Sequence, residues 1–202
     1  MKLLVNVRGT NGSGKSTIPL SMMADPEMYI IEKPFEGKNK KILTVFPTYG
    51  WVALGCYLTK TGGLDCLPNK KIKHKALWYA LKHLDTYNII MEGVIDSTIF
   101  STYKDLFREV ENKCPHRKVV ILNLTPPLNV CLDRVQKRNG GKAVKEEQIE
   151  SKYNTVVRNA EKFKRSEFKS IRWDNSKISK DRVLEVFLRR MEKYGNFSGN
   201  KR

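Results

Sequence analysis

Short apolar runs alternate with longer amphipathic stretches along the 202 residues of the chain. Continuous apolar runs such as 119–124 are typical of parallel strands that are covered on both faces. Stretches whose apolar positions recur every three or four residues are typical of helices with one buried face. We expect strands at 2–7, 28–32, 88–91, 119–124 and 168–173. We expect helices before Pro26, at 98–112, 130–138 and 146–163, and after a capping Ser179, the last one ending at Gly195.

This alternation of strands and helices predicts an α/β sandwich with three layers and a mainly parallel sheet. The length suits one domain, which we expect to cover residues 1–195. Residues 33–82 are interpreted as an inserted basic region that binds the acceptor, and residues near 134–160 as a lid. The tail 196–202 is basic, and we expect it to be disordered. Ligands of such sheets bind at the carboxyl ends of the strands, where the informative residues of this sequence lie.

The charge balance adds a prediction about the partner. Lys and Arg number 38 and Asp and Glu 21, so the net charge is +17, which favours a polyanion such as nucleic acid. No apolar run approaches the roughly 20 residues of a membrane helix, and the start of the chain lacks the long apolar stretch of a signal peptide. The four cysteines are scattered without zinc-site spacing. We therefore expect free thiols, no zinc, no membrane contact and a cytoplasmic location.

One glycine-rich segment carries the clearest chemistry. It follows the first strand, precedes a helix and fits the pattern G-x-x-x-x-G-K-[ST]. In this pattern, backbone N–H groups surround phosphates, the lysine reaches the β- and γ-phosphates, and the next hydroxyl faces Mg²⁺. The segment predicts a nucleotide site with ATP and Mg²⁺ as cofactors. Its residues are Gly9, Thr10, Asn11, Gly12, Ser13, Gly14, Lys15, Ser16 and Thr17.

Two further features fit phosphoryl transfer. Glu92 follows an apolar strand, where a carboxylate would join Ser16 in holding the metal ion or its water. Arg134 and Arg138 stand four residues apart and share one helix face beside a Gly-Gly joint. Two arginines on a mobile lid are suited to neutralise the transferred phosphoryl group. An ordinary solvated Glu and a solvated basic helix face are the alternatives.

These motifs, together with a late strand ending in Trp173-Asp174-Asn175, resemble the nucleoside and nucleoside monophosphate kinase group of P-loop kinases over most of residues 1–175. The basic character and the segments Gly62-Gly63-Leu64-Asp65 and Met91-Glu92-Gly93 resemble, more narrowly, the bacteriophage kinases of 5-hydroxymethyluracil in DNA. That resemblance implies transfer of a phosphoryl group from ATP to the 5-hydroxymethyl group, as a step toward hypermodified thymidine in a viral genome. The acidic-Arg-aromatic signature of thymidylate kinases is missing.

Residues 33–82, the region interpreted as binding the acceptor, contain ten lysines and two acidic residues. So many cations suggest a DNA backbone followed over several phosphates, and we name Lys70, Lys71, Lys73 and Lys75 as its contacts. Tyr49 and Trp51 lie in a loop-like stretch and are predicted to stack on a base, although aromatic residues also fill cores.

The base that takes the hydroxyl proton stays open between two acidic residues. Asp65 is an acidic residue in a basic, glycine-flanked loop, where it accepts that proton, caps a turn or pairs with a lysine. Glu92 is its rival for this role. Two other functions also stay open: a kinase of free nucleosides or nucleotides, and a non-catalytic switch that binds ATP and DNA.

Overall fold

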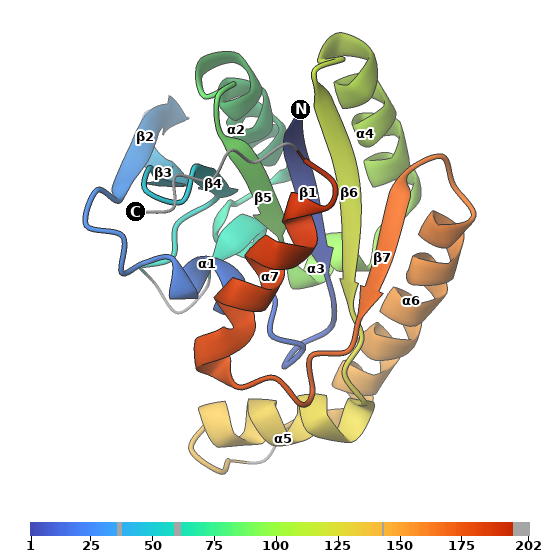
Figure 1. Cartoon of the computed structure of the whole chain (residues 1–202). Coiled ribbons are helices and arrows are strands. Elements are labelled where there is room, and N and C mark those ends of the chain that lie inside the picture. Colours follow the sequence, from blue (N-terminus) through green and yellow to red (C-terminus); the bar gives the residue numbers. More distant parts are fainter. Residues whose placement is uncertain (36–37, 59–61, 143, 196–202) are drawn as a thin grey trace.

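The computed structural model describes residues 1–35, 38–58, 62–142 and 144–195, so the tail 196–202 lies outside the described residues. A seven-stranded sheet with the order β2-β3-β4-β5-β1-β6-β7 forms its centre (Figure 1). The strands are β1 (Lys2–Arg8), β2 (Tyr29–Phe35), β3 (Lys38–Phe46), β4 (Trp51–Leu54), β5 (Asn88–Glu92), β6 (Arg117–Leu124) and β7 (Lys169–Trp173). The helices are α1 (Thr17–Ser21), α2 (Lys70–His83), α3 (Val94–Ser97), α4 (Ser101–Lys113), α5 (Leu128–Arg138), α6 (Glu146–Lys164) and α7 (Val183–Glu192), with 3₁₀ turns η1 (Gly63–Cys66) and η2 (Lys180–Arg182).

The sheet is mainly parallel, as the sequence predicts. Parallel pairs join β4, β5, β1, β6 and β7, while β3 runs against its two neighbours and forms antiparallel pairs with β2 and β4. In the central β1, Leu3, Leu4, Val5 and Val7 have no exposed surface. This is the behaviour of a strand that is covered on both faces.

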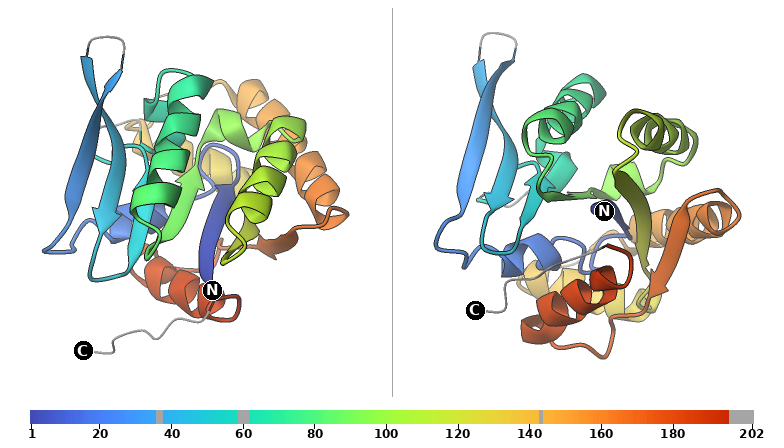
Figure 2. Two further views of the ribbon diagram at one scale, coloured as in Figure 1. Left: turned by 90° about the horizontal axis from the view of Figure 1, so that it is seen from above. Right: turned by 45° about the horizontal axis from the view of Figure 1, so that its top comes forward.

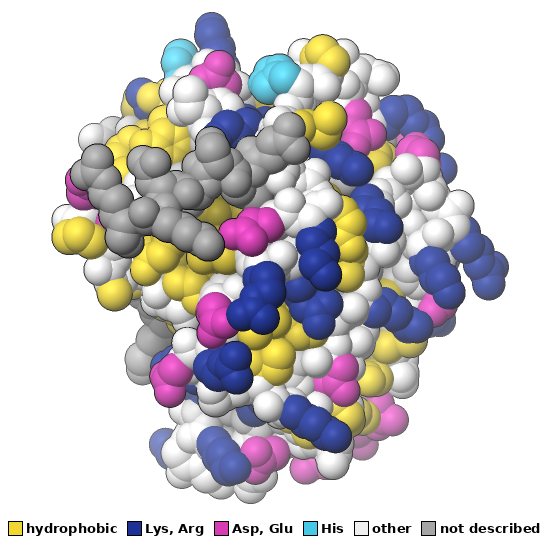
Figure 3. Space-filling model, in the orientation of Figure 1, with side chains coloured by type: hydrophobic (Ala, Val, Ile, Leu, Met, Phe, Trp, Pro, Cys, Tyr) yellow, Lys and Arg dark blue, Asp and Glu magenta, His cyan; other side chains and the backbone are white. Residues whose placement is uncertain are grey.

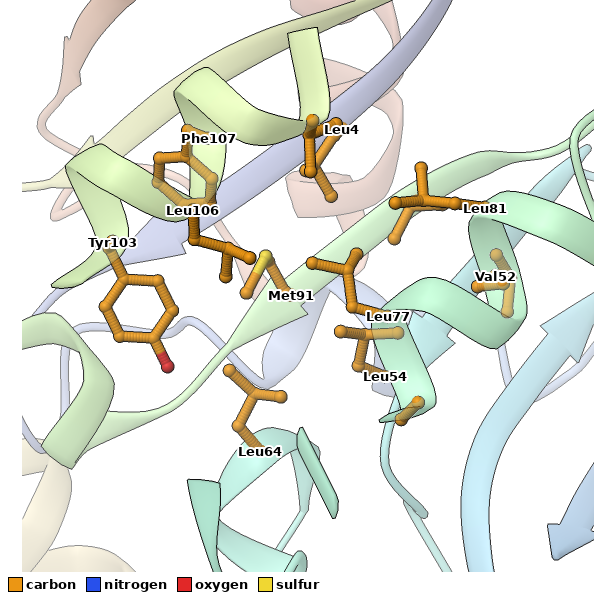
Figure 4. Close-up of a cluster of buried hydrophobic side chains, with 14 of the residues drawn as sticks. Leu4, Val52, Leu54, Leu64, Leu77, Leu81, Met91, Tyr103, Leu106 and Phe107 are labelled. Carbon is orange, nitrogen blue, oxygen red and sulfur yellow. The ribbon is translucent and has the colours of Figure 1, made fainter. Parts of the chain in front are cut away.

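Helices cover both faces of the sheet and complete the three layers (Figures 1 and 2). On one face, α2 and α4 pack on the central strands, and Figure 4 shows Met91 of β5 between Leu77 of α2 and Leu106 of α4. On the other face, α1 and α7 contact each other and cover a second cluster of apolar side chains. Phe187 of α7 lies at the centre of this second cluster and is fully buried.

The region predicted as an insertion is in large part an integral piece of the sheet. β3 and β4 come from this region, and α2 packs on them. The stretches 42–46 and 51–54 of this region are buried as strands of the sheet, and an insertion relative to other kinases stays a prediction. The segment between β4 and α2 also contributes Tyr57, Leu64 and Leu67 to the core. Residues 38–41 of β3 extend beyond the part of the strand that pairs with β4.

All five parallel strands end at one edge of the sheet. β1 ends at Arg8, directly before the glycine-rich turn. The neighbouring strand β5 ends at Glu92, which pairs with Val7 of β1, so the two strands end side by side. β6 ends at Leu124, and its partner β7 ends at Trp173. The predicted phosphate site and the predicted carboxylate therefore meet at the carboxyl edge of the sheet, as ligand sites of such folds do.

Candidate active site

Two glycines shape the turn between β1 and α1. Gly12 has a φ of +76° and Gly14 a φ of +91°, a region that favours glycine. A Cβ on Gly12 would lie 2.2 Å from the carbonyl oxygen of Cys131, so the turn packs directly on α5. From the other side, the Asn175 amide donates a hydrogen bond of 3.0 Å to the carbonyl oxygen of Ser13. The phosphate turn is thus held between α5 and the segment that follows β7.

Lys15 lies inside this turn. Its Nζ donates a hydrogen bond of 2.9 Å to the carbonyl oxygen of Thr10, and the side chain is buried. Burial lowers the pKa of Lys15, and the negative charge of Glu92 offsets part of that effect. An ammonium group in a turn of N–H donors at the start of a helix provides the electrostatic environment that phosphates require.

The carboxylate of Glu92 faces the phosphate turn. Its Oε1 accepts hydrogen bonds from Ser16 Oγ at 3.0 Å and from Tyr57 Oη at 3.2 Å. Burial raises the pKa of Glu92, while Lys15 and the hydroxyl of Ser16 act in the opposite direction. The predicted pair Ser16–Glu92 is therefore together in the structure, in a largely desolvated place.

Gly63 closes in on the same carboxylate from the side of η1. A Cβ at this position would lie 2.2 Å from Glu92 Oε1, and the φ of Gly63 is +61°. Only a glycine allows this approach without moving the carboxylate. The loop that carries Asp65 is thereby placed against the end of β5.

Asp65 performs a local structural task. Its Oδ2 accepts a hydrogen bond of 2.8 Å from the backbone N–H of Val94, at the start of α3. Its Oδ1 is buried without a hydrogen-bond partner among the described residues. A Cβ on Gly93 would lie 3.1 Å from this oxygen, which places Asp65 next to Glu92 in space. The capping alternative is confirmed, and a role as base stays a prediction.

Arg134 and Arg138 both line the cavity in front of the phosphate turn. Arg134 donates to the carbonyl oxygens of Gly12, at 3.4 Å, and Asn175, at 3.2 Å. The cavity has a volume of about 390 Å³ and extends along α1 toward Lys180. We call this space the donor cavity, because the predicted phosphate-binding residues open into it.

A second cavity of about 390 Å³ lies on the other side of α3. It is enclosed by η1 and by the starts of α2, α3 and α4. We call it the acceptor cavity. Its charged and hydrogen-bonding residues include Asp65, Lys70, Lys73, His74, Asp96 and Tyr103.

Sequence reasoning missed the charge network that builds this second cavity. Asp96 is buried, and Lys73 Nζ contacts both of its oxygens, at 2.7 and 3.0 Å, while Tyr103 donates to it through its hydroxyl. Arg8, also buried, donates to the carbonyl oxygens of Ser97 at 2.6 Å and Ile99 at 2.8 Å. Burial lowers the pKa of Arg8 to about 10. One signal was present: an arginine at the end of an otherwise apolar strand.

The residues predicted to contact DNA do not form one surface. Trp51 is the first residue of β4, packs on Phe187 and has no exposed area, so its predicted stacking on a base was wrong. Because β4 runs parallel to β5, Trp51 and the half-buried Tyr49 before it lie at the amino edge, opposite the phosphate turn. The stacking of Tyr49 on a base stays a prediction, at a place away from the phosphate turn.

The four predicted lysines behave differently from one another. Lys73 is ion-paired with Asp96 and mostly buried, which argues against its predicted phosphate contact, since that contact would break the pair. Lys70, Lys71 and Lys75 are exposed on α2, so a contact with DNA stays a prediction for them.

A glycine turn between strand and helix, a carboxylate at the next strand end and two cavities at one sheet edge define the class of P-loop kinases. The chain resembles, in fold, the YorR protein from Bacillus subtilis in complex with phosphorylated GDP, with a TM-score of 0.52 and 16% identity over 95% of this chain and 98% of that one.

Within this class, the chain belongs to the 5-hmdU DNA kinase family, whose model matches residues 2–176. It is 49% identical over 190 residues to the 5-hmdU DNA kinase of Bacillus phage SP10, covering 92% of this chain and 29% of that protein. It is 32% identical over 168 residues to 5-hmdU DNA kinase 1 of Salmonella phage ViI, covering 80% of this chain and 70% of that protein. The chain thus spans less than a third of the SP10 protein.

Two glycine substitutions test the importance of the close approach between Gly63 and Glu92. Gly63→Ala should lower kcat by at least about 10-fold, because the new methyl group displaces the Glu92 carboxylate from its position beside Ser16. Gly50→Ala is the matched control, since Gly50 has a φ of +68° but nothing within 4 Å of an added Cβ among the described residues. Both variants carry the same backbone strain, of about 1–2 kcal/mol. An equal loss of kcat in the two variants, with equal urea midpoints, would contradict the role of this contact.

Proposed function

We propose that the chain transfers the γ-phosphoryl group of ATP to the hydroxymethyl oxygen of 5-hydroxymethyluracil in DNA. Membership of the 5-hmdU DNA kinase family supports this substrate. The observation that carries the proposal is the junction of the two cavities at the end of β5. Val94 lines the donor cavity and Ile95, the next residue, lines the acceptor cavity, directly after Glu92 and Gly93. A phosphoryl group in one cavity and a hydroxyl group in the other meet at this turn.

The chain's own residues would contribute to the transfer as follows. The hydroxymethyl oxygen forms a bond to the γ-phosphorus, and the bond from that phosphorus to the β–γ bridging oxygen breaks, releasing ADP. Lys15 and the N–H groups of the phosphate turn neutralise the charge on the β- and γ-phosphates. Arg134 and Arg138 contact the transferred group from the opposite wall of the donor cavity. Asp65, whose Oδ1 has no hydrogen-bond partner within the described ranges, accepts the hydroxyl proton.

Ser16 and Glu92 offer two oxygen ligands for Mg²⁺. Their oxygens are 3.0 Å apart and face the place where the β- and γ-phosphates bind. Within the described part of the chain no three His, Cys, Asp or Glu side chains cluster as an all-protein metal site requires. This donor set fits Mg²⁺, which takes one or two protein ligands and fills its shell with water and phosphate oxygens. The bound ion would supply charge neutralisation at the phosphates.

The polymeric substrate agrees with the net charge of +17. Lys and Arg side chains are spread over the face drawn in Figure 3 and do not collect in one patch there, so charge alone does not locate the DNA. No helix in the described ranges has both the length and the apolar character needed to span a bilayer.

The function is tested with labelled ATP and four acceptors: DNA containing 5-hydroxymethyluracil, unmodified DNA, the free 5-hydroxymethyl-deoxyuridine nucleoside and free deoxynucleotides. After digestion, we expect label on the 5-hydroxymethyl group of the modified DNA alone. The Lys15→Ala variant should keep its fold and lose transfer, because Lys15 acts on phosphates. Its circular dichroism spectrum and unfolding transition provide the control.

Each of the other outcomes overturns the proposal in a different way. Label on the free nucleoside or nucleotides alone identifies a kinase of small molecules. Binding of ATP and DNA without transfer identifies a non-catalytic switch. Unchanged transfer by Lys15→Ala removes the phosphate turn from the mechanism.

The lid arginine makes a separate prediction. Arg138→Ala should lower kcat by at least about 10-fold and change the KM for ATP little, because an arginine at the transferred group acts mainly in the transition state. Lys137→Ala is the matched control, since Lys137 is exposed and pairs with Asp133 at 2.9 Å on the same helix. If Arg138→Ala raises only the KM for ATP, Arg138 contributes to the binding of ATP and not to the stabilisation of the transition state.

A further inference from the structure

A groove lies between the β2–β3 hairpin and α2, away from both cavities of the candidate active site. Its volume is about 350 Å³. The floor is apolar and aromatic, and lysines stand around it. Its lining consists of Pro34, Ile42, Ile72, Trp78 and Tyr79 together with Lys33, Lys75 and Lys82.

The groove opens at the carboxyl edge of the sheet. Leu43 of β3 pairs with Leu54, the last residue of β4, so residues 38–42 extend past the end of that parallel strand. The hairpin therefore projects beyond the edge at which the phosphate turn lies. Figure 2 shows it standing beside α2 and reaching past the start of that helix. The groove and the acceptor cavity flank the same helix on the same edge.

The aromatic side chains on the floor of the groove are of the kind on which nucleobases stack. Trp78 and Tyr79 are half-buried, and the Lys33 ammonium lies 4.4 Å from the centroid of the Tyr79 ring. Aromatic rings accept the flat face of any base, so a base stacked on Tyr79 would move Lys33, which lies over that ring, toward the adjoining phosphate. A duplex keeps its base faces stacked and hidden, so such a floor suits an unpaired strand.

The charges that line the groove indicate which kind of ligand can bind there. The groove lining includes three lysines and no acidic residue among the described residues. An apolar peptide offers no anion to these lysines, and a second copy of this chain has 21 acidic residues but a net charge of +17, which opposes its approach to a basic groove. A DNA strand offers both phosphates and base faces.

We propose that the groove holds a single-stranded part of the DNA substrate, with a base stacked on Trp78 and Tyr79 and phosphates on Lys33, Lys75 and Lys82. This inference rests on the proposed function for the identity of the polymer. It replaces the predicted platform of Tyr49 and Trp51, which lies at the opposite edge.

The groove and the acceptor cavity lie on different sides of α2. Ile72 and Lys75 line the groove, whereas Lys70, Lys73 and His74 of the same helical turns line the acceptor cavity. A strand that occupies both must pass around the start of α2, so substrates too short to do so should lose the contribution of the groove.

Tryptophan fluorescence reports on this contact directly. Trp51 and Trp173 are 0% and 2% exposed, so a base can stack only on Trp78 among the three tryptophans. Titration with a single-stranded oligonucleotide bearing one 5-hydroxymethyluracil, without ATP, should quench the fluorescence of the full chain. Trp78→Phe should lose the quench while keeping DNA affinity within about threefold, because phenylalanine still offers a ring face.

Salt dependence tests the lysines. Each phosphate contact on a single strand contributes about −0.7 to the slope of log affinity against log salt, so replacing Lys33, Lys75 and Lys82 by Gln should reduce the slope by up to about 2. The matched control replaces Lys162, Lys164 and Lys193, which are exposed elsewhere, and should leave the slope as it is.

The outcomes separate this inference from the proposed function. Equal slopes in the two triple variants, or no quench that depends on Trp78, overturn the groove whatever the kinase assay shows. A change in sedimentation with unchanged DNA affinity in the groove variants would make the groove a protein interface and also overturn it. A reduced slope together with a Trp78-dependent quench supports the groove even if no phosphoryl transfer is detected, and in that case the proposed function fails alone.

Discussion

The burial of the Glu92 carboxylate is the constraint on which the site depends. A carboxylate held away from water needs partners, and the raised pKa of Glu92 shows that its partners compensate only in part for burial. Ser16 supplies one hydrogen bond from the phosphate turn, and Tyr57 supplies another from the loop after β4. Gly63 lets that loop approach within contact distance. One side chain thus fixes two loops that are distant in sequence, and with them the walls of both cavities.

Other buried charges around Glu92 also have a partner of opposite sign. Lys15 balances Glu92, and Lys73 balances Asp96, each within the carboxyl edge of the sheet. Because the pKa of Glu92 is raised in the fold, its contribution to stability is lost as the pH rises through that raised value. The ionised carboxylate is therefore kept at the expense of folding free energy. Such a compromise is expected where a charge serves a ligand instead of the core.

Features of the site that depend on a short stretch of sequence could be predicted. The glycine turn, the strand before it, Glu92 after β5 and the i, i+4 spacing of Arg134 and Arg138 are all local, and the structure brings them to one edge. Features that depend on distant partners were missed. The pair of Lys73 and Asp96 joins residues 23 positions apart. A four-residue apolar strand such as β4 cannot be told from a loop by periodicity, and that ambiguity placed Trp51 at the surface.

The central claim is that phosphoryl transfer takes place at the buried Glu92 carboxylate, where the two cavities meet. The most direct measurement is the single-turnover rate of transfer by the Glu92→Gln variant, compared with its affinity for DNA. Glutamine keeps the size of the side chain and removes its charge. The account predicts a rate at least about 100-fold lower with DNA affinity unchanged, since the amide oxygen can still accept the hydrogen bonds of Ser16 and Tyr57, whereas the lost charge weakens the metal site at the reacting phosphates. A single-turnover rate equal to that of the wild type would contradict it.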